Sequence, residues 1–410
     1  MIPRLSGPRF DAVSAIPLRH GSISATNPAQ LFSTLCQRPD LFWLDSGTKL
    51  TSTAWSYLGM DPLMKLEVQS NKVVIETGGV RHVQRSSDPV GHALELLTQV
   101  QKPLLIPSGA PPFCGGWVGY FSYDFFNETK SCGVAATPLA VFNFFKGILA
   151  YSHRTDQWWS CDLLSATENI MAQSNATYLK SLAVSPIAIA IASRLPAASF
   201  AGSNFAPGQY ISQVNRVLDY IRAGDIYQIN LAQRFSCPWP HPPSLLFESL
   251  REQSPAQYGA FLGSGLLGND QAICSISPEL FLSVRGDKIT TRPIKGTRPR
   301  DADASSNEGA RRELAGSSKE IAELNMIIDL ERNDLGRICD YGSVRVTSAG
   351  DVEELPTLFH RVGTVEGRLR MGCTLSDILH ATFPGGSITG APKIRAMQII
   401  DELEPDARGA

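Results

Sequence analysis

The sequence lacks closely spaced cysteines and histidines. The two closest of its eight cysteines, Cys114 and Cys132, are 18 positions apart, so it contains no CxxC redox pair and no zinc knuckle. Its seven histidines form neither an HxxxH nor an HExxH pattern. These absences exclude the common zinc-site motifs and favour buried thiols in a reducing compartment.

Long hydrophobic runs and an excess of one charge are also missing. The most apolar window, 182–195, is too short and too interrupted to span a bilayer, and the first residues contain no secretory apolar core. A formal net charge of −2 argues against an extended surface for nucleic acid. We therefore expect a cytoplasmic protein with no membrane or nucleic-acid partner, in which a local basic cluster serves a small anion.

The composition is that of a globular protein with more than one domain. Of 410 residues, 43% are hydrophobic and 19% are charged. Short apolar runs between turn residues predict strands over 41–90, whereas 173–205 is rich in Ala, Ser and Pro. We expect an N-terminal region over 1–150, a connector over 151–204 and a catalytic region over 205–410.

The second half of the chain predicts a mixture of helices and strands. Ile211, Leu218 and Ile221 share a helical stripe that Gly224 ends. Alternating apolar and polar residues predict a strand over 227–235, and Gly286-Asp287 predicts a hairpin turn. Two further helices are expected, over 307–335 with an apolar stripe of Ile321, Leu324 and Ile328, and from Pro392 through Leu403.

Lys295 lies between Pro293 and Gly296, in the run 292–300. Pro293 fixes the backbone on one side, and Gly296 allows a ligand to approach the chain on the other. A lysine in this setting can be a nucleophile if burial and neighbouring cations lower its pKa. The alternative is a solvated basic turn after a hairpin.

Four further features are candidates for the same site. Glu320 and Glu323 are three apart on a helix, so both carboxylates can face one Mg²⁺, although such pairs also occur on solvated faces. The glycine-rich loop 385–390 offers backbone N–H groups to an anion. Glu279 is either a general acid or an ordinary carboxylate before a strand, and His360 is by default a packed histidine.

Five motifs in the second half resemble the chorismate-utilising enzymes, which include anthranilate, isochorismate, salicylate and aminodeoxychorismate synthases. The order and spacing of the motifs match over about 205–410. The motifs are 224–231, 277–279, 293–297, 329–335 and 385–393. The first 150 residues resemble the same enzymes through 44–47 and 113–124. The resemblance implies an α+β fold of two orthogonally packed antiparallel sheets with helices on the outside.

Lys295 distinguishes between members of this group. Anthranilate synthases resemble Pro-Ile-Ala-Gly-Thr here, whereas aminodeoxychorismate synthases have Pro-Ile-Lys-Gly-Thr, as in this chain. The resemblance implies that Lys295 attacks C2 of chorismate, that ammonia from a glutamine amidotransferase then adds at C4, and that the product serves p-aminobenzoate and folate synthesis. It further implies that Glu279 is the general acid/base and that His360 lies beside the ring.

The resemblance also assigns binding roles. Glu320 and Glu323 are expected to hold Mg²⁺. Substrate contacts are expected from Thr297, Gly385, Gly386, Ser387, Thr389, Gly390 and Lys393. A tryptophan pocket in the N-terminal half is expected to be formed by Ser46, Ser52, Thr53, Ala54, Trp55, Gln257, Tyr258 and Gly259.

The chain departs from the family pattern at several points. The family usually has an arginine at Ala54, a serine at Gly363 and often an arginine at Asn127. Family members continue for a few dozen residues beyond Ala410, with core strands and a second glutamate pair for Mg²⁺. Two alternatives therefore stay open: an anthranilate synthase component I, and a non-catalytic paralogue that binds only the amidotransferase or tryptophan.

Overall fold

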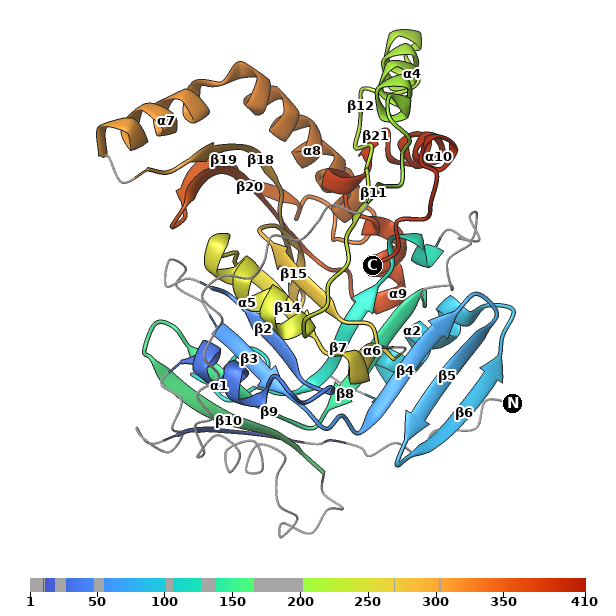
Figure 1. Cartoon of the computed structure of the whole chain (residues 1–410), viewed down its shortest axis with the longest axis vertical. Helices are drawn as coiled ribbons and strands as arrows, with labels where there is room; N and C mark the ends of the chain where they lie inside the picture. The colour runs from blue at the N-terminus through green and yellow to red at the C-terminus, as the bar shows by residue number, and fades with distance from the viewer. Residues whose placement is uncertain are drawn as a thin grey trace.

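Helices and antiparallel strands make up the chain, so the expected α+β class is confirmed (Figure 1). The computed structural model describes residues 10, 12–18, 27–47, 55–100, 106–126, 138–165, 202–268, 270–301 and 304–410. Within these ranges the strands form three larger sheets and two short pairs. No helix there is long and apolar enough to cross a membrane.

Two sheets form the N-terminal half. The larger has seven strands in the order β1 (Ala12–Pro17), β10 (Gln157–Leu164), β9 (Gly147–Ser152), β3 (Trp55–Gly59), β2 (Phe42–Asp45), β14 (Tyr258–Leu262) and β15 (Ile273–Ser277). The second has five, in the order β6 (Val80–Arg85), β5 (Lys72–Thr77), β4 (Met64–Gln69), β8 (Ala140–Phe145) and β7 (Gly116–Phe121). Around them lie α1 (Pro28–Leu35), α2 (Pro89–Val100), the 3₁₀ turn η1 (Tyr123–Phe126), α5 (Pro243–Gln253) and α6 (Ser264–Leu267).

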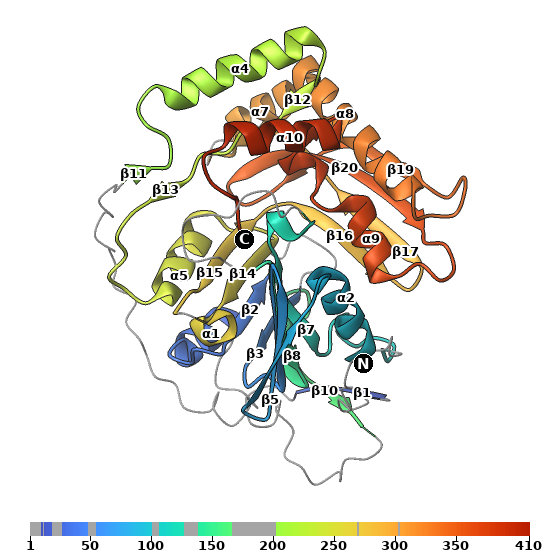
Figure 2. The same cartoon turned by 90° about the vertical axis from the view of Figure 1, so that its right-hand side faces the viewer.

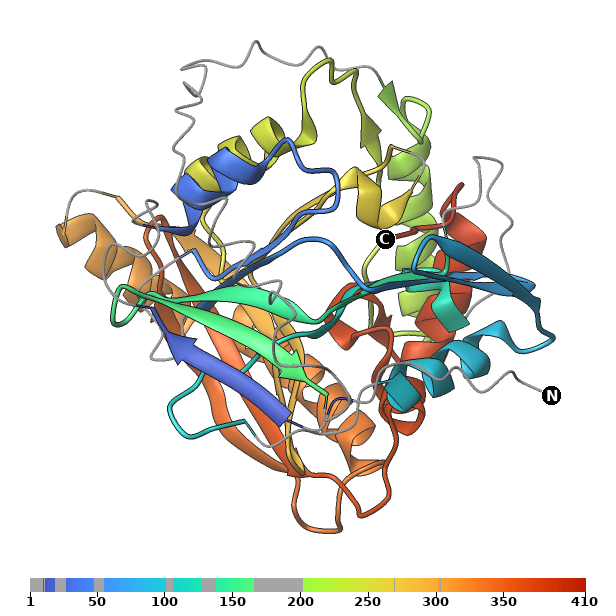
Figure 3. The ribbon, with the colours of Figure 1, turned by 90° about the horizontal axis from the view of Figure 1, so that it is seen from below.

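A third sheet forms the C-terminal half. Its strands are β16 (Leu280–Arg285), β17 (Lys288–Arg292), β20 (Leu358–Arg368) and β18 (Ile294–Pro299), with β19 (Arg345–Glu354) also paired to β20. Helices α7 (Ala304–Gly316) and α8 (Ser318–Gly336) pack on this sheet (Figure 1), and α9 (Leu375–Thr382) packs between α8 and α2. In Figure 3 the blue and green strands of the N-terminal half lie in front of this orange and red half.

A smaller layer of short elements lies beyond the third sheet (Figure 2). It contains α4 (Gln209–Ala223), α10 (Lys393–Leu403), η2 (Gly386–Ile388), and the pairs β11 (Gly202–Ser203) with β13 (Phe235–Ser236) and β12 (Gln228–Ile229) with β21 (Gly390–Ala391). Its core combines Val217 and Ile226 with Ala396, Ile399 and Leu403.

The two halves are joined by strands that return to the first sheet. β14 pairs with β2, so Gly259 lies opposite Asp45, and β14 also pairs with β15. The chain then leaves β15 at Ser277 and enters the third sheet at Leu280. Glu279 therefore lies at the crossing between the two halves. In the expected connector, β10 keeps the chain in the first sheet to Leu164, and 166–201 lie outside the described residues.

Several predicted elements agree with the structure. Gly286, with φ 61°, forms the hairpin turn that pairs Arg285 with Lys288. Gly224, with φ 82°, caps α4, and α10 ends at Leu403 as expected. Their common basis is local backbone chemistry, because a positive φ at a turn or helix end is inexpensive only for glycine.

Three predictions were wrong in detail. The helix expected over 307–335 is two helices, because Gly316 ends α7 and the Ser317 hydroxyl caps α8 by accepting from the backbone of Glu320. The strand over 227–235 is reduced to the ends of that range, where β12 and β13 lie. On α4, the stripe containing Ile211 is exposed, and Val217 is the residue that packs inward.

Candidate active site

A β-bulge presents Lys295. Ile294 pairs with Val362 and Thr297 pairs with His360, so Lys295 and Gly296 together lie opposite one residue of β20. Gly296 has a φ of +84°, and a Cβ there would lie 2.7 Å from Leu314 Cδ1. The position therefore requires glycine for both its backbone angle and the close approach of α7.

Glu279 lies next to Lys295. Burial raises the pKa of the Glu279 carboxyl, and the Ser387 side chain and the charge of Lys295 offset part of this rise. These three residues come from the β15–β16 connection, β18 and the glycine-rich loop. The fold therefore brings together a lysine, a carboxyl group with a raised pKa and a loop of backbone N–H groups, which is the composition of an acid/base and nucleophile site.

His360 is held against Thr297. Its Nδ1 lies 3.0 Å from Thr297 Oγ1, and the residue is only 7% exposed. Burial lowers the pKa of His360, and a backbone hydrogen bond at Gly296 offsets part of this change. The imidazole is therefore neutral at pH 7 and packs behind the Lys295 bulge. The Thr297 hydroxyl is hydrogen-bonded to this imidazole.

The glycine-rich loop is fixed from within and from β12. Thr389 is fully buried, and its hydroxyl donates to the Gly385 carbonyl over 2.9 Å. Asn230 Nδ2 donates to the Ser387 carbonyl over 3.1 Å. A Cβ on Gly386 would lie 2.8 Å from Leu330 Cδ2. Thr389 therefore shapes the loop, whereas Gly386 is required because α8 lies directly against it.

Lys393 is engaged beneath this loop. Its ammonium group contacts the Asp334 carboxylate and donates to the Thr382 carbonyl over 3.0 Å. Asp334 is buried and Lys393 is largely buried, with 13% of the Lys393 side chain and 8% of the Asp334 side chain exposed. Lys393, which the resemblance assigned to substrate, therefore ties α10 to α8 and α9 in this structure.

Glu320 and Glu323 lie on one side of α8. A Cβ on Gly296 would lie 3.1 Å from Glu320 Cδ, so Glu320 borders the Lys295 bulge. Arg298 Nη1 lies 3.7 Å from Glu320 Oε1, and Lys319 Nζ lies 3.8 Å from Glu323 Oε1. Across the described ranges no three His, Cys, Asp or Glu side chains form a metal cluster. Two carboxylates still fit Mg²⁺, which is often held by one or two carboxylates plus substrate and water.

The sequence did not single out Glu331. This residue is 8% exposed, and Thr291 Oγ1 donates to its Oε2 over 3.0 Å. Burial raises the pKa of Glu331 to about 8, and the charges of Glu279 and Asp334 contribute to the rise. A signal was present, because Glu331 continues the apolar stripe of Leu324 and Ile328 at helical spacing.

A cavity of about 890 Å³ separates the seven-stranded sheet from the third sheet. Among the residues expected to bind tryptophan, those lining it are Ser46, Trp55, Gln257, Tyr258 and Gly259. They meet because β2 pairs with β14. The Ser46 hydroxyl is buried without a hydrogen-bond partner in the described structure. Positions 52–54 lie outside the described residues.

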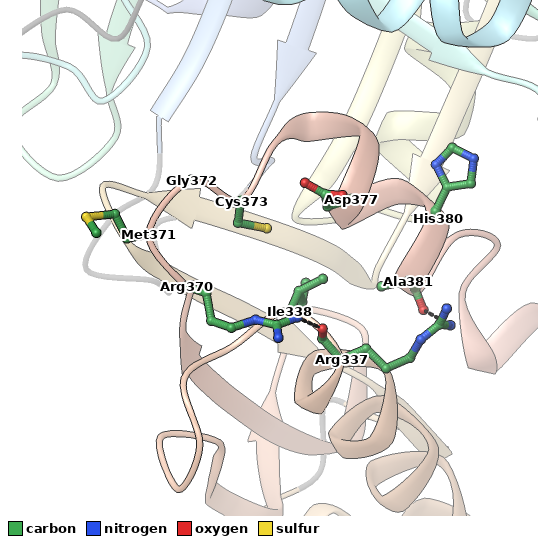
Figure 4. A pocket seen from close by; sticks show the side chains of 9 residues that line it. All are labelled: Arg337, Ile338, Arg370, Met371, Gly372, Cys373, Asp377, His380 and Ala381. Atoms are coloured by element: carbon green, nitrogen blue, oxygen red, sulfur yellow. Dashed lines mark hydrogen bonds between the residues drawn. The ribbon is translucent and has the colours of Figure 1, made fainter.

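A second cavity, of about 500 Å³, lies between the end of α8 and the start of α9 (Figure 4). Arg337 and Arg370 line it together with Cys373, Asp377 and His380. Arg370 donates to the Arg337 carbonyl, and Asp377 accepts from Thr374 in the capping box of α9. None of the residues expected at the active site lines this cavity, so we place the candidate site at the Lys295 bulge.

The chain is similar over most of its length to known chorismate-utilising proteins. The family model described as chorismate binding enzyme matches residues 39–410. Aminodeoxychorismate synthase component 1 of Bacillus subtilis is 38% identical over 73% of this chain and 64% of its own length. Anthranilate synthase component 1 of Thermus thermophilus is 32% identical over 93% of this chain and 81% of its own.

A solved structure gives the same result. Anthranilate synthase component I from Streptococcus pneumoniae matches with a TM-score of 0.66 and 28% identity, over 88% of this chain and 80% of that chain. The match to the Bacillus relative spans less than two thirds of the relative's length. Sequence and structure comparisons thus agree with the five motifs, and the chain belongs to the chorismate binding enzyme family.

Proposed function

We propose that this chain is the chorismate-aminating component of an aminodeoxychorismate synthase, acting in the cytoplasm on the route to p-aminobenzoate and folate. The observation behind the proposal is the bulge that sets Lys295 beside Glu279, with His360 and Thr297 behind it. The Bacillus subtilis relative with this name is 38% identical in sequence.

In the proposed first step, the side-chain nitrogen of Lys295 forms a bond to C2 of chorismate. Both ring double bonds shift toward C4, the C4–O bond breaks, and the leaving hydroxyl takes a proton from Glu279 and departs as water. Glu279 suits this role because burial raises its pKa, so it keeps its proton to a higher pH than an exposed glutamate does. A covalent lysine adduct divides one difficult displacement into two easier steps.

In the proposed second step, ammonia forms a bond to C4, both double bonds shift back, and the C2–N bond to Lys295 breaks. The lysine nitrogen leaves as a free amine, and Glu279 removes the proton that ammonia loses. The chain is proposed to receive ammonia from a separate glutamine amidotransferase. The designation "component 1" of the relatives supports a partner component.

Glu320 and Glu323 are proposed to hold Mg²⁺ beside the bulge. When bound there, Mg²⁺ would supply positive charge for a carboxylate of the substrate. Backbone N–H groups of the loop before Ile388 would bind the remaining anionic oxygens, because the N–H groups of Ile388 and Thr389 already donate to carbonyls within the loop. Glu320 is well placed for this role, since it contacts the residue that follows Lys295.

Product analysis tests the proposal. With chorismate, Mg²⁺ and ammonium, we expect 4-amino-4-deoxychorismate, detected as p-aminobenzoate after addition of a lyase. The second candidate is anthranilate synthase component I, because a relative with that name matches 93% of this chain. Fluorescent anthranilate formed without a lyase would establish that alternative. A chain that binds the amidotransferase and forms neither product would be a non-catalytic paralogue.

The cavity of about 890 Å³ is proposed to bind tryptophan. Trp55 and Tyr57 offer aromatic surface, and Ser46 lines the cavity with a buried hydroxyl that has no hydrogen-bond partner in the described structure. In equilibrium dialysis with labelled tryptophan, Ser46→Ala is expected to weaken binding by roughly 3- to 10-fold, the value of one hydrogen bond. Ser283→Ala, on the opposite wall of the cavity, is the matched control. Equal affinities of Ser46→Ala and the unmodified chain would place the ligand elsewhere.

A further inference from the structure

Three carboxyl groups gather beneath the candidate site, and only two of them have a cation. Glu279 lies beside Lys295, and Asp334 contacts Lys393. The third, Glu331, forms no ion pair with any residue that the structure describes, and its hydrogen bond comes from the neutral hydroxyl of Thr291. Cations therefore balance the charge of Glu279 and Asp334, whereas Glu331 has no ion-pair partner among the described residues.

Glu331 is in addition one of the most buried carboxyl groups near the site, at 8% exposure. Removing a carboxylate from water without a cation or several donors is costly, so such a group retains its proton instead. The charged groups that act on Glu331 are Glu279 before β16, Asp334 on α8 and Lys393 on α10. The two carboxylates favour the protonated form of Glu331, and burial places its pKa at about 8.

The location of Glu331 connects it to the loop that is proposed to bind anions. A narrow cavity of about 10 Å³, room for about one water, lies among Glu331, Thr291, Gly385 and Gly386. A negative charge on Glu331 would thus lie across a one-water space from Gly385 and Gly386, in the loop that is proposed to bind a carboxylate of the substrate. The same charge would also act on Glu279.

We propose that Glu331 is a positioning residue that works as a neutral carboxylic acid, anchored by Thr291, and keeps negative charge away from the glycine-rich loop and Glu279. This inference rests on the proposed function, because chorismate carries two carboxylates. When Glu331 loses its proton in alkaline solution, the new charge repels the substrate and holds the proton on Glu279. Affinity for chorismate then falls.

One arm of the test measures kinetics. For the unmodified chain, kcat/KM for chorismate at a fixed concentration of free ammonia is expected to fall tenfold per pH unit above about pH 8, mostly through KM. Glu331→Gln keeps the shape of the side chain without the titration, and its profile should lack this fall. Thr291→Val removes a hydrogen bond that lowers the pKa of Glu331, so the fall should move to higher pH. A purely structural Glu331 would leave the fall unchanged in both variants.

A second arm does not depend on activity. A carboxyl group with a raised pKa in the folded state binds about one proton on folding between its unfolded and folded pKa values. Between about pH 5.5 and 7.5, the unfolding equilibrium constant of the unmodified chain should therefore rise about tenfold per pH unit relative to that of Glu331→Gln. Parallel pH dependences of the two proteins would overturn the inference. The expected proton uptake in a chain that turns over nothing would support the neutral acid and overturn the proposed function instead.

Discussion

Replacing Lys295 with alanine is expected to abolish the covalent adduct with chorismate and to lower kcat/KM by roughly 10³-fold, or about 4 kcal/mol of transition-state stabilisation. The reason is local, since the bulge at Lys295 and Gly296 places no second amine beside Glu279 among the described residues. The adduct is measured as an increase in intact mass after incubation with chorismate and Mg²⁺ in the absence of ammonia.

Lys72→Ala is the matched control for this experiment. Lys72 pairs with Arg85 at the start of β5, in a sheet that contributes nothing to the candidate site, so its replacement should leave the adduct intact. The decisive comparison is the mass spectrum of the two variants. An undiminished adduct in Lys295→Ala would end the assignment of Lys295 as the nucleophile.

Short-range features of the fold could be predicted from sequence because their causes are local. The hairpin at Gly286 and the cap at Gly224 follow from positive φ angles. The break between α7 and α8 was missed, although Gly316 and Ser317 are a known stop and start, because the apolar period continues across them. Periodicity identifies the buried face of a helix and says little about where the helix is interrupted.

The sequence identifies the candidate residues, and the structure brings several of them together, whereas their roles stay predictions. Lys295, Glu279 and His360 do lie together, and the spacing of Glu320 and Glu323 places them on one face. The ion pair of Lys393 could not be predicted, because it joins residues 59 positions apart. Burial likewise raises the pKa of Glu331, and that burial arises only in the folded chain, where Glu331 lies against Thr291 and the glycine-rich loop.

Lys393→Met is the prediction with the largest expected effect on stability. The ammonium group of Lys393 contacts Asp334 and the Thr382 carbonyl, and only 13% of the Lys393 side chain and 8% of the Asp334 side chain are exposed. Removing one partner of a buried ion pair leaves an uncompensated charge and typically costs about 3–5 kcal/mol. We expect a loss of that size in the free energy of unfolding, measured by urea denaturation at about pH 8.

The control for this variant is the same substitution at an exposed pair. Lys319 lies 3.8 Å from Glu323 with 78% of its side chain exposed, and an exposed helical pair is worth about 0.3–0.5 kcal/mol. Lys319→Met should therefore change stability by no more than that. Equal losses in the two variants would mean that the Lys393 contact contributes no more than a surface pair.

The loss of stability in Lys393→Met should depend on pH, and the pKa of Asp334 determines the direction of this dependence. Burial already raises the pKa of Asp334, and Lys393 opposes that rise. Without Lys393 the folded-state pKa of Asp334 rises further above the unfolded value, so the folded variant must retain a proton that the unfolded chain releases. Stability from the protonated carboxyl is present at low pH and is lost as pH rises through the folded pKa. The defect should therefore be smaller at about pH 5 than at about pH 8, whereas a cavity left by the lysine side chain alone would give the same loss at both.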